Sequence, residues 1–161
     1  MKCLKSFSGF TLIELIVVVA IMIIFSGVSI SAYFQFSQRQ EVLNDARSVA
    51  TTFRRVQSMA RNLVYPSGCS GLSGYRLYTD CDVYDDSCKN MKASASCSTG
   101  GEILVFDEDV LLETSFLGLV DVFFVAGSGS PVSSFDLTLG ADPYEAQITI
   151  DESGNINVAD L

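Results

Sequence analysis

Residues 10–25 read FTLIELIVVVAIMIIF, and the apolar run continues to residue 34 with Glu14 as its only charge. A helix of about 20 apolar residues crosses the hydrocarbon core of a bilayer, so residues 10–34 are predicted to form a transmembrane helix. Lys2 and Lys5 precede this run, and the next basic residue is Arg39. The positive-inside rule then predicts that residues 1–9 stay in the cytoplasm and that the chain after about residue 35 lies outside.

Glu14 separates three interpretations of this segment. A cleaved secretory signal peptide needs a basic start, an apolar core and a small-residue cleavage site, for which residues 28–32 could serve. An uncut signal anchor needs only the first two. Neither needs an ionisable side chain in its first turns, where a carboxylate is costly and is by default functional. The third interpretation, a precursor cut before the helix, gives Glu14 a role.

The sequence from Ser8 to Leu15, SGFTLIEL, resembles the processing motif of type IV pilins and type II secretion pseudopilins. The match combines a short basic leader, a Gly-Phe junction, a glutamate at the fifth mature position and the apolar run. The resemblance implies that residues 1–9 are a leader, that a prepilin peptidase cuts after Gly9, and that the new N-terminus at Phe10 is methylated. It also implies that Glu14 is the residue used in assembly.

Elementary electrostatics gives the same role to Glu14. Cleavage leaves a positively charged amine on Phe10, and the Glu14 carboxylate of a neighbouring subunit would neutralise it in a low-dielectric setting. Such a buried pair adds little net stability after desolvation, but it sets the axial register of two apolar helices.

Residues 35–64 are predicted to continue the helix as an amphipathic half. Apolar residues recur every three or four positions, and basic residues lie on the opposite face. No proline interrupts residues 10–65, and Pro66 with Gly68 supplies a stop signal after about Asn62. The apolar face consists of Val42, Ala46, Val49, Phe53, Val56, Ala60 and Leu63, and the basic face of Arg47, Arg54, Arg55 and Arg61.

Residues 65–161 are predicted to be a globular β-rich domain, so the fold class is α+β: a long N-terminal helix packed on an antiparallel sheet. A turn is predicted at 107–109 and a hairpin connection at 152–155. The predicted strands are Tyr75–Thr79, Glu102–Asp107, Val110–Phe116, Leu119–Ala126, Ser133–Leu139, Glu145–Ile150 and Asn155–Val158. The sequence Ile148-Thr149-Ile150, followed by Gly154, is similar to the last hairpin of minor pilins and pseudopilins.

Four of the five cysteines, Cys69, Cys81, Cys88 and Cys97, cluster in the predicted extracellular part, which indicates disulfides. Four cysteines allow three pairings, and we favour Cys69 with Cys81 and Cys88 with Cys97 because each pair brackets turn-rich sequence. Cys3 lies in the predicted leader. Without histidine or a Cys-x-x-Cys pair, zinc is not expected.

The acidic loop 80–86 carries Asp80, Asp82, Asp85 and Asp86. Calcium prefers several oxygen ligands from such a loop, but the glycine and final glutamate of an EF-hand are missing. A solvated loop is favoured, and no metal or other cofactor is predicted.

Charge and motifs limit the function further. The net charge is −9, and after Lys92 there are twelve acidic residues and no basic one, so no nucleic-acid binding is expected. No nucleophile elbow or phosphate loop is present, which argues against an enzyme.

The leading hypothesis is a structural subunit of a type IV pilus or related pseudopilus. Its expected partners are other pilin subunits in a helical filament, the prepilin peptidase, the assembly machinery and the membrane. It would be a single-pass cell-membrane precursor, and then part of an extracellular pilus or periplasmic pseudopilus. The alternatives are a pilus-tip adhesion module and a plain membrane-anchored surface protein.

Overall fold

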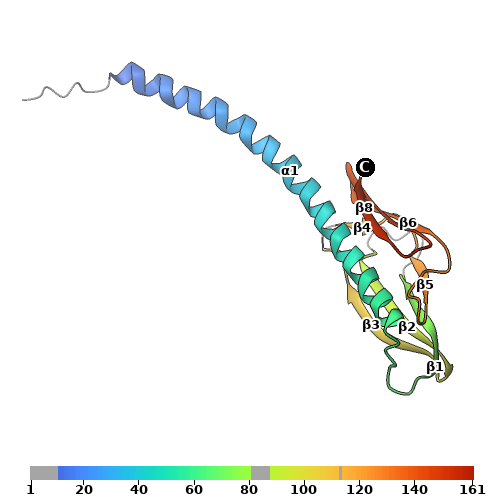
Figure 1. The fold of residues 1–161 in the computed structure, drawn as a ribbon. Helices are drawn as coiled ribbons and strands as arrows, with labels where there is room; N and C mark the ends of the chain where they lie inside the picture. The colour runs from blue at the N-terminus through green and yellow to red at the C-terminus, as the bar shows by residue number, and fades with distance from the viewer. Residues whose placement is uncertain (1–10, 81–87, 113) are drawn as a thin grey trace, which may run out of the picture. The chain divides into compact units, whose positions relative to one another are not determined.

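The structure, a computed structural model, describes residues 11–80, 88–112 and 114–161, without the side chains of residues 26–29 and 31–32. The chain divides into two compact units, Met1–Ser37 and Gln38–Leu161. Helix α1 (Leu12–Arg61) belongs to both, and all the strands belong to the second (Figure 1). The predicted long helix is therefore confirmed from Leu12 to Arg61, one residue before its expected end at about Asn62.

In the second unit, α1 buries the apolar face that its sequence predicts. Val49 and Phe53 lie at the centre of this face and are fully buried. Leu63 was expected on the same face but is 45% exposed. The helix ends at Arg61, and the backbone of Leu63 has a positive φ of 50°, so its side chain no longer follows the helical repeat. The other members, Val42, Ala46, Val56 and Ala60, are buried as predicted.

One four-stranded sheet is built from the first half of the domain. Its strands are β1 (Ser70–Tyr78), β2 (Asn90–Thr99), β3 (Gly101–Asp109) and β5 (Asp121–Val125). They pair antiparallel in the order β3-β2-β1-β5. We call this the first sheet.

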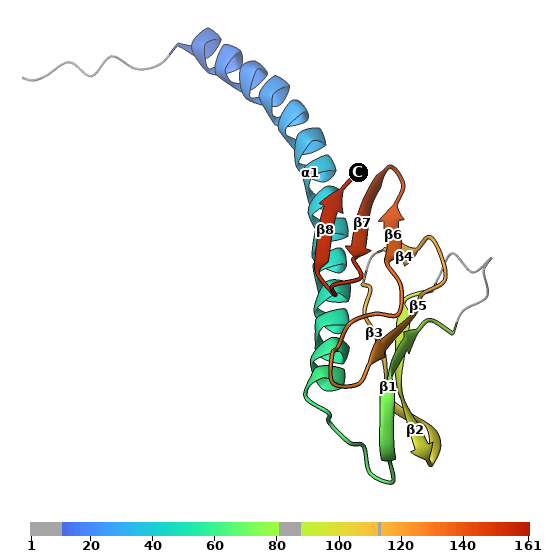
Figure 2. The ribbon, with the colours of Figure 1, turned by 45° about the vertical axis from the view of Figure 1, so that its right-hand side comes forward.

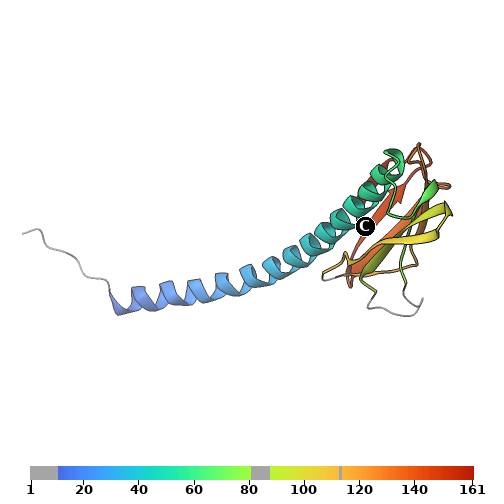
Figure 3. The ribbon, with the colours of Figure 1, turned by 90° about the horizontal axis from the view of Figure 1, so that it is seen from below.

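The second sheet is built from the other four strands. They are β4 (Ser115–Phe116), β6 (Phe135–Ala141), β7 (Tyr144–Ile150) and β8 (Ile156–Asp160), in the antiparallel order β4-β6-β7-β8. Both sheets lie on one side of the second half of α1 (Figures 2 and 3). The predicted α+β class is confirmed, with two antiparallel sheets where one was expected.

Phe53 of α1 joins the two sheets in the core. Its ring lies 6.5 Å from that of Phe124 on β5 and 6.4 Å from that of Phe135 on β6, measured between centroids. Edge-on and tilted aromatic pairs at this separation are favourable beyond the apolar area that they bury. Around Phe53, strand residues that alternate toward α1 are buried, among them Tyr75, Leu77, Met91, Leu139, Ile148 and Ile150.

The strand prediction was wrong in three places: one strand was missed, one is shorter than predicted, and one predicted turn is part of a strand. Strand β2 was not predicted, because its sequence NMKASASCST is rich in alanine and serine, which do not favour strands. Of the described residues in the expected strand Val110–Phe116, only the last two form a strand, β4. The turn expected at residues 107–109 is the end of β3, where Asn90 of β2 pairs with Asp109.

The hairpin between β7 and β8 is confirmed, and a side chain closes it. The backbone N–H and the amide of Asn155 each donate to the Asp151 carboxylate at 2.8 Å. These hydrogen bonds lower the pKa of Asp151 below its ordinary value. Gly154 supplies the positive φ of 82° that the turn requires.

Candidate assembly site

In the first unit, Glu14 lies in the opening turn of α1. Thr11 precedes the helix, and its hydroxyl and carbonyl oxygens both accept from the Glu14 backbone N–H, at 3.4 and 3.1 Å. A threonine cap followed three residues later by glutamate is the arrangement of a capping box. The helix N-terminus also favours a carboxylate in this turn. Sequence analysis gave Glu14 an assembly role but missed that the Thr11-x-x-Glu14 spacing also starts the helix.

The helix surface around Glu14 is apolar on all sides and uncovered. Before Glu14, the side chains of Leu12 and Ile13 are 76% and 71% exposed, and after it Leu15 is 62% exposed. Every large apolar side chain from Leu12 to Phe25 is exposed in this unit. A helix that is apolar on all sides is expected to be buried, in a membrane or among other helices. Among the described residues, no helix meets the length and hydropathy of a membrane span.

The two residues of the expected cleavage site, Gly9 and Phe10, lie outside the described residues, as does the whole leader 1–9. The first described residue of this site is therefore Thr11, which directly follows the expected new N-terminus. Cleavage at Gly9 and methylation at Phe10 stay predictions.

The second unit contains a buried carboxylate that sequence analysis did not single out. Asp45 on α1 is 5% exposed and accepts from the Leu112 N–H at 3.2 Å, the Thr114 N–H at 3.0 Å and the Thr114 hydroxyl at 2.8 Å. The Asp45 carboxylate thus supplies the hydrogen-bond acceptor for inward-facing donors of the loop between β3 and β4. The only signal in the sequence was an aspartate directly beside Ala46 on the apolar face.

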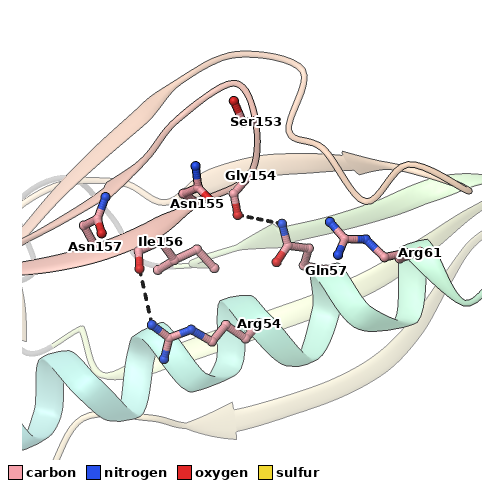
Figure 4. A pocket seen from close by; sticks show the side chains of 8 residues that line it. All are labelled: Arg54, Gln57, Arg61, Ser153, Gly154, Asn155, Ile156 and Asn157. Carbon is pink, nitrogen blue, oxygen red and sulfur yellow. Dashed lines mark hydrogen bonds between the residues drawn. The ribbon is translucent and has the colours of Figure 1, made fainter.

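An open groove of about 530 Å³ lies between α1 and the β7–β8 hairpin. Gln57 on the helix donates to the Gly154 carbonyl at 2.8 Å, and Arg54 donates to the Ile156 carbonyl at 3.3 Å (Figure 4). Arg61 also lines the groove, and its Nε donates to the Ser128 carbonyl at 3.2 Å. These bonds join the helix to the hairpin and, at Ser128, to the segment between β5 and β6. All the acceptors are neutral, so the guanidinium groups have no counter-charge in the groove lining.

The predicted disulfides are confirmed in part, and their predicted pairing is wrong. Cys69 is bonded to Cys97, with the two Cα atoms 5.5 Å apart. Cys69 directly precedes β1, and Cys97 lies on β2, the antiparallel neighbour of β1, so the pairing of these strands brings the start of β1 close to the end of β2 that holds Cys97. The sequential pairing was predicted without strand β2, and therefore without the pairing of β1 with β2. Cys88 is also disulfide-bonded, and Cys81 lies outside the described residues, as does Cys3.

Of the acidic loop, only Asp80 is described, and it accepts from Lys92 Nζ at 2.6 Å. Asp82, Asp85 and Asp86 lie outside the described residues. The described ranges contain no group of three or more residues arranged to hold a metal ion.

Comparison with known proteins identifies the N-terminal element. Residues 4–30 match the family model described as the prokaryotic N-terminal methylation motif. This prepilin-type motif is that of the type IV pilins and pseudopilins, which are structural proteins and not enzymes. It includes Gly9, Phe10 and Glu14 and ends within the apolar half of α1. Neither a curated protein nor a solved structure matches the chain.

Proposed function

We propose that this protein is a structural subunit of a type IV pilus or a related pseudopilus, cut after Gly9 and methylated on Phe10. One observation carries the proposal: Glu14 is the only charged residue of the apolar segment 10–34, whose first part lies within the match to the prepilin methylation motif. An apolar helix of this kind serves first as the membrane anchor of the precursor, over residues 10–34, and then as the core of a filament.

The assembly step follows from the position of Glu14. The new amine of Phe10 would lie four residues before the carboxylate, close to the start of α1. A carboxylate in an apolar bundle needs a counter-charge, and the amine of the adjacent subunit supplies one. Because each subunit carries both charges at the same end, every copy pairs with the next, and the pairing repeats along a filament.

The mature N-terminus tests the proposal most directly. Mass spectrometry of the protein from its own cells should find N-methylphenylalanine at Phe10. A cut after residue 26, or an uncut Met1, would contradict the prepilin assignment. Gly9→Leu should leave an unshifted precursor on a gel.

Incorporation into filaments tests the role of Glu14. Glu14→Gln should be cut and folded normally but should be strongly depleted from sheared filaments. Glu152→Gln, in the exposed β7–β8 hairpin, makes the same chemical change as a control. Equal incorporation of the two variants would show that Glu14 does not direct assembly. Abundance in the same filaments also distinguishes a repeating subunit from a scarce tip adhesin.

A further inference from the structure

Three arginines form a straight basic stripe on the second half of α1. Arg47, Arg54 and Arg61 are seven residues apart and all exposed. Seven residues are close to two helical turns, so the three side chains project from the same face of the helix, at intervals of about 10.5 Å along its axis. We call these three residues the arginine stripe.

The charges of the stripe are not compensated within the described part of the chain. Each guanidinium donates to a neutral oxygen: Asn44 Oδ1 at 3.4 Å for Arg47, and backbone carbonyls for Arg54 and Arg61. The chain has no Asp or Glu from residue 46 to residue 62. The other described arginines all have carboxylate partners, in the pairs Arg39–Asp160, Arg55–Glu108 and Arg76–Asp121.

A complementary acidic surface lies on the outer face of the second sheet. Leu137 of β6 and Ile148 of β7 point inward and are buried, so Asp136 and Glu145, at alternate positions, point outward and are exposed. Glu145 pairs with Gly140, four residues along β6 from Asp136, which separates the two carboxylates by about 13 Å. Neither carboxylate has a cationic partner among the described residues.

This face also lacks any basic residue of its own. No Lys or Arg follows Lys92 in the chain, so β6, β7 and β8 contribute none. Asp142 in the β6–β7 turn adds a third exposed carboxylate. The spacing of the two sheet carboxylates, about 13 Å, is close to the interval of about 10.5 Å in the stripe.

We propose that the arginine stripe of one copy binds the outer face of the second sheet of the next copy, through Asp136 and Glu145. The inference rests on the proposed function, because the apolar helices must first bring the copies together. In this contact the stripe of each copy binds the sheet of the next copy, so it is a head-to-tail, heterologous contact. Such a contact extends into an open helical filament where its rotation does not close a ring.

Exposed ion pairs of this kind contribute more to orientation than to affinity. Each copy has a net negative charge, so the globular domains repel one another in free solution. Anchoring through the helix raises their effective concentration, and the stripe then selects one rotation of the neighbouring domain. This contact is separate from the pairing of Glu14 with an amine, which sets the axial position.

Charge reversal in the full chain tests this contact in sheared filaments. Arg47→Glu with Arg54→Glu should lower incorporation by about tenfold, because two attractions become repulsions. Arg55→Glu with Arg76→Glu makes the same change in net charge at arginines that have partners within the chain, and it should lower incorporation much less. Asp136→Arg with Glu145→Arg, added to the stripe variant, should restore incorporation.

The results test the stripe–sheet contact and the proposed function separately. If the stripe variant and its control are incorporated equally, the inference is overturned. It is overturned as well if the sheet reversal fails to rescue the stripe variant, and the stripe would then bind another acidic partner. A wild-type chain that is uncut or missing from filaments contradicts the proposed function instead. N-terminal processing of every variant is checked on the same samples.

Discussion

The Thr114 hydroxyl donates a 2.8 Å hydrogen bond to the buried carboxylate of Asp45, so that a loop of the sheet region is bound to the helix. Asp45→Ala removes the acceptor for this hydroxyl and for two backbone N–H groups. Buried donors left without a partner cost about 1–3 kcal/mol each. Because the loop can turn some of them to water, we expect a loss of about 2–4 kcal/mol in the free energy of unfolding, measured by thermal unfolding of the full chain in detergent.

Asp136→Ala is the matched control, since it removes an exposed carboxylate with no described partner. Its effect should stay within about 0.5 kcal/mol, as for most surface substitutions. Equal losses for the two variants would show that the hydrogen bonds of Asp45 do not stabilise the fold.

The helix could be predicted from the sequence because its apolar residues recur at a regular helical spacing. The three- and four-residue spacing of Val49, Phe53, Val56 and Ala60 is a local signal, and each of these residues is buried. Residues 156–160 were likewise predictable, because turn residues with special backbone preferences precede them.

What the sequence did not reveal depends on contacts between distant segments. The strand β2 is held between two neighbours, so the ladder overrides the weak strand preference of its alanines and serines. Without β2, the Cys69–Cys97 pair could not be found. The role of Asp45 depends on donors 67 and 69 residues away, which no local pattern shows.

The disulfide can be checked by peptide mapping without reduction. Trypsin should release residues 62–76, which hold Cys69, residues 77–89, which hold Cys81 and Cys88, and residues 93–161, which hold Cys97. The Cys69–Cys97 bond predicts a linked species made of the first and third peptides alone. A species containing all three peptides would instead mean that Cys69 and Cys97 each pair with a cysteine of the middle peptide, as sequential pairing requires, and would contradict the Cys69–Cys97 bond.

Loss of this bond should lower stability. It closes a loop with a sequence separation of 28 residues, and the chain-entropy estimate for a loop of this size is about 3–4 kcal/mol. Cys69→Ser with Cys97→Ser should lower the free energy of unfolding by up to about that amount, in the same detergent assay. Ser70→Ala with Ser98→Ala is a control at adjacent positions and should have a much smaller effect.

The ion pair between Arg76 and Asp121 should make stability depend on pH. Arg76 donates twice to the Asp121 carboxylate, at 2.8 Å each, and these hydrogen bonds lower the pKa of Asp121 from its ordinary 3.8. A carboxyl group with a lowered pKa in the folded state stabilises the fold above pH 3.8 and loses this effect as the pH falls through the folded value. Since both side chains are about half exposed, the contribution should be less than about 1 kcal/mol.

A double-mutant cycle with Arg76→Gln and Asp121→Asn isolates this pair from the contact of Arg76 with Tyr78. The coupling free energy should be present at pH 7 and should vanish as Asp121 is protonated. A coupling that stays constant down to pH 2 would mean that the charge of Asp121 is not its source.

Gly74 on β1 is a position where a single methyl group should disturb the first sheet. A Cβ atom there would lie 2.3 Å from the Phe124 carbonyl oxygen and 2.6 Å from the Phe123 ring. The carbonyl belongs to the backbone of β5, which pairs with Gly74 in the ladder, so the strand itself must shift. Overpacking of this kind costs about 1–3 kcal/mol, and Gly74→Ala should lower the free energy of unfolding by that amount. Gly118→Ala adds the same methyl group where no atom lies within 4 Å and should be nearly neutral, so equal effects at both positions would contradict the close approach of β5 to β1.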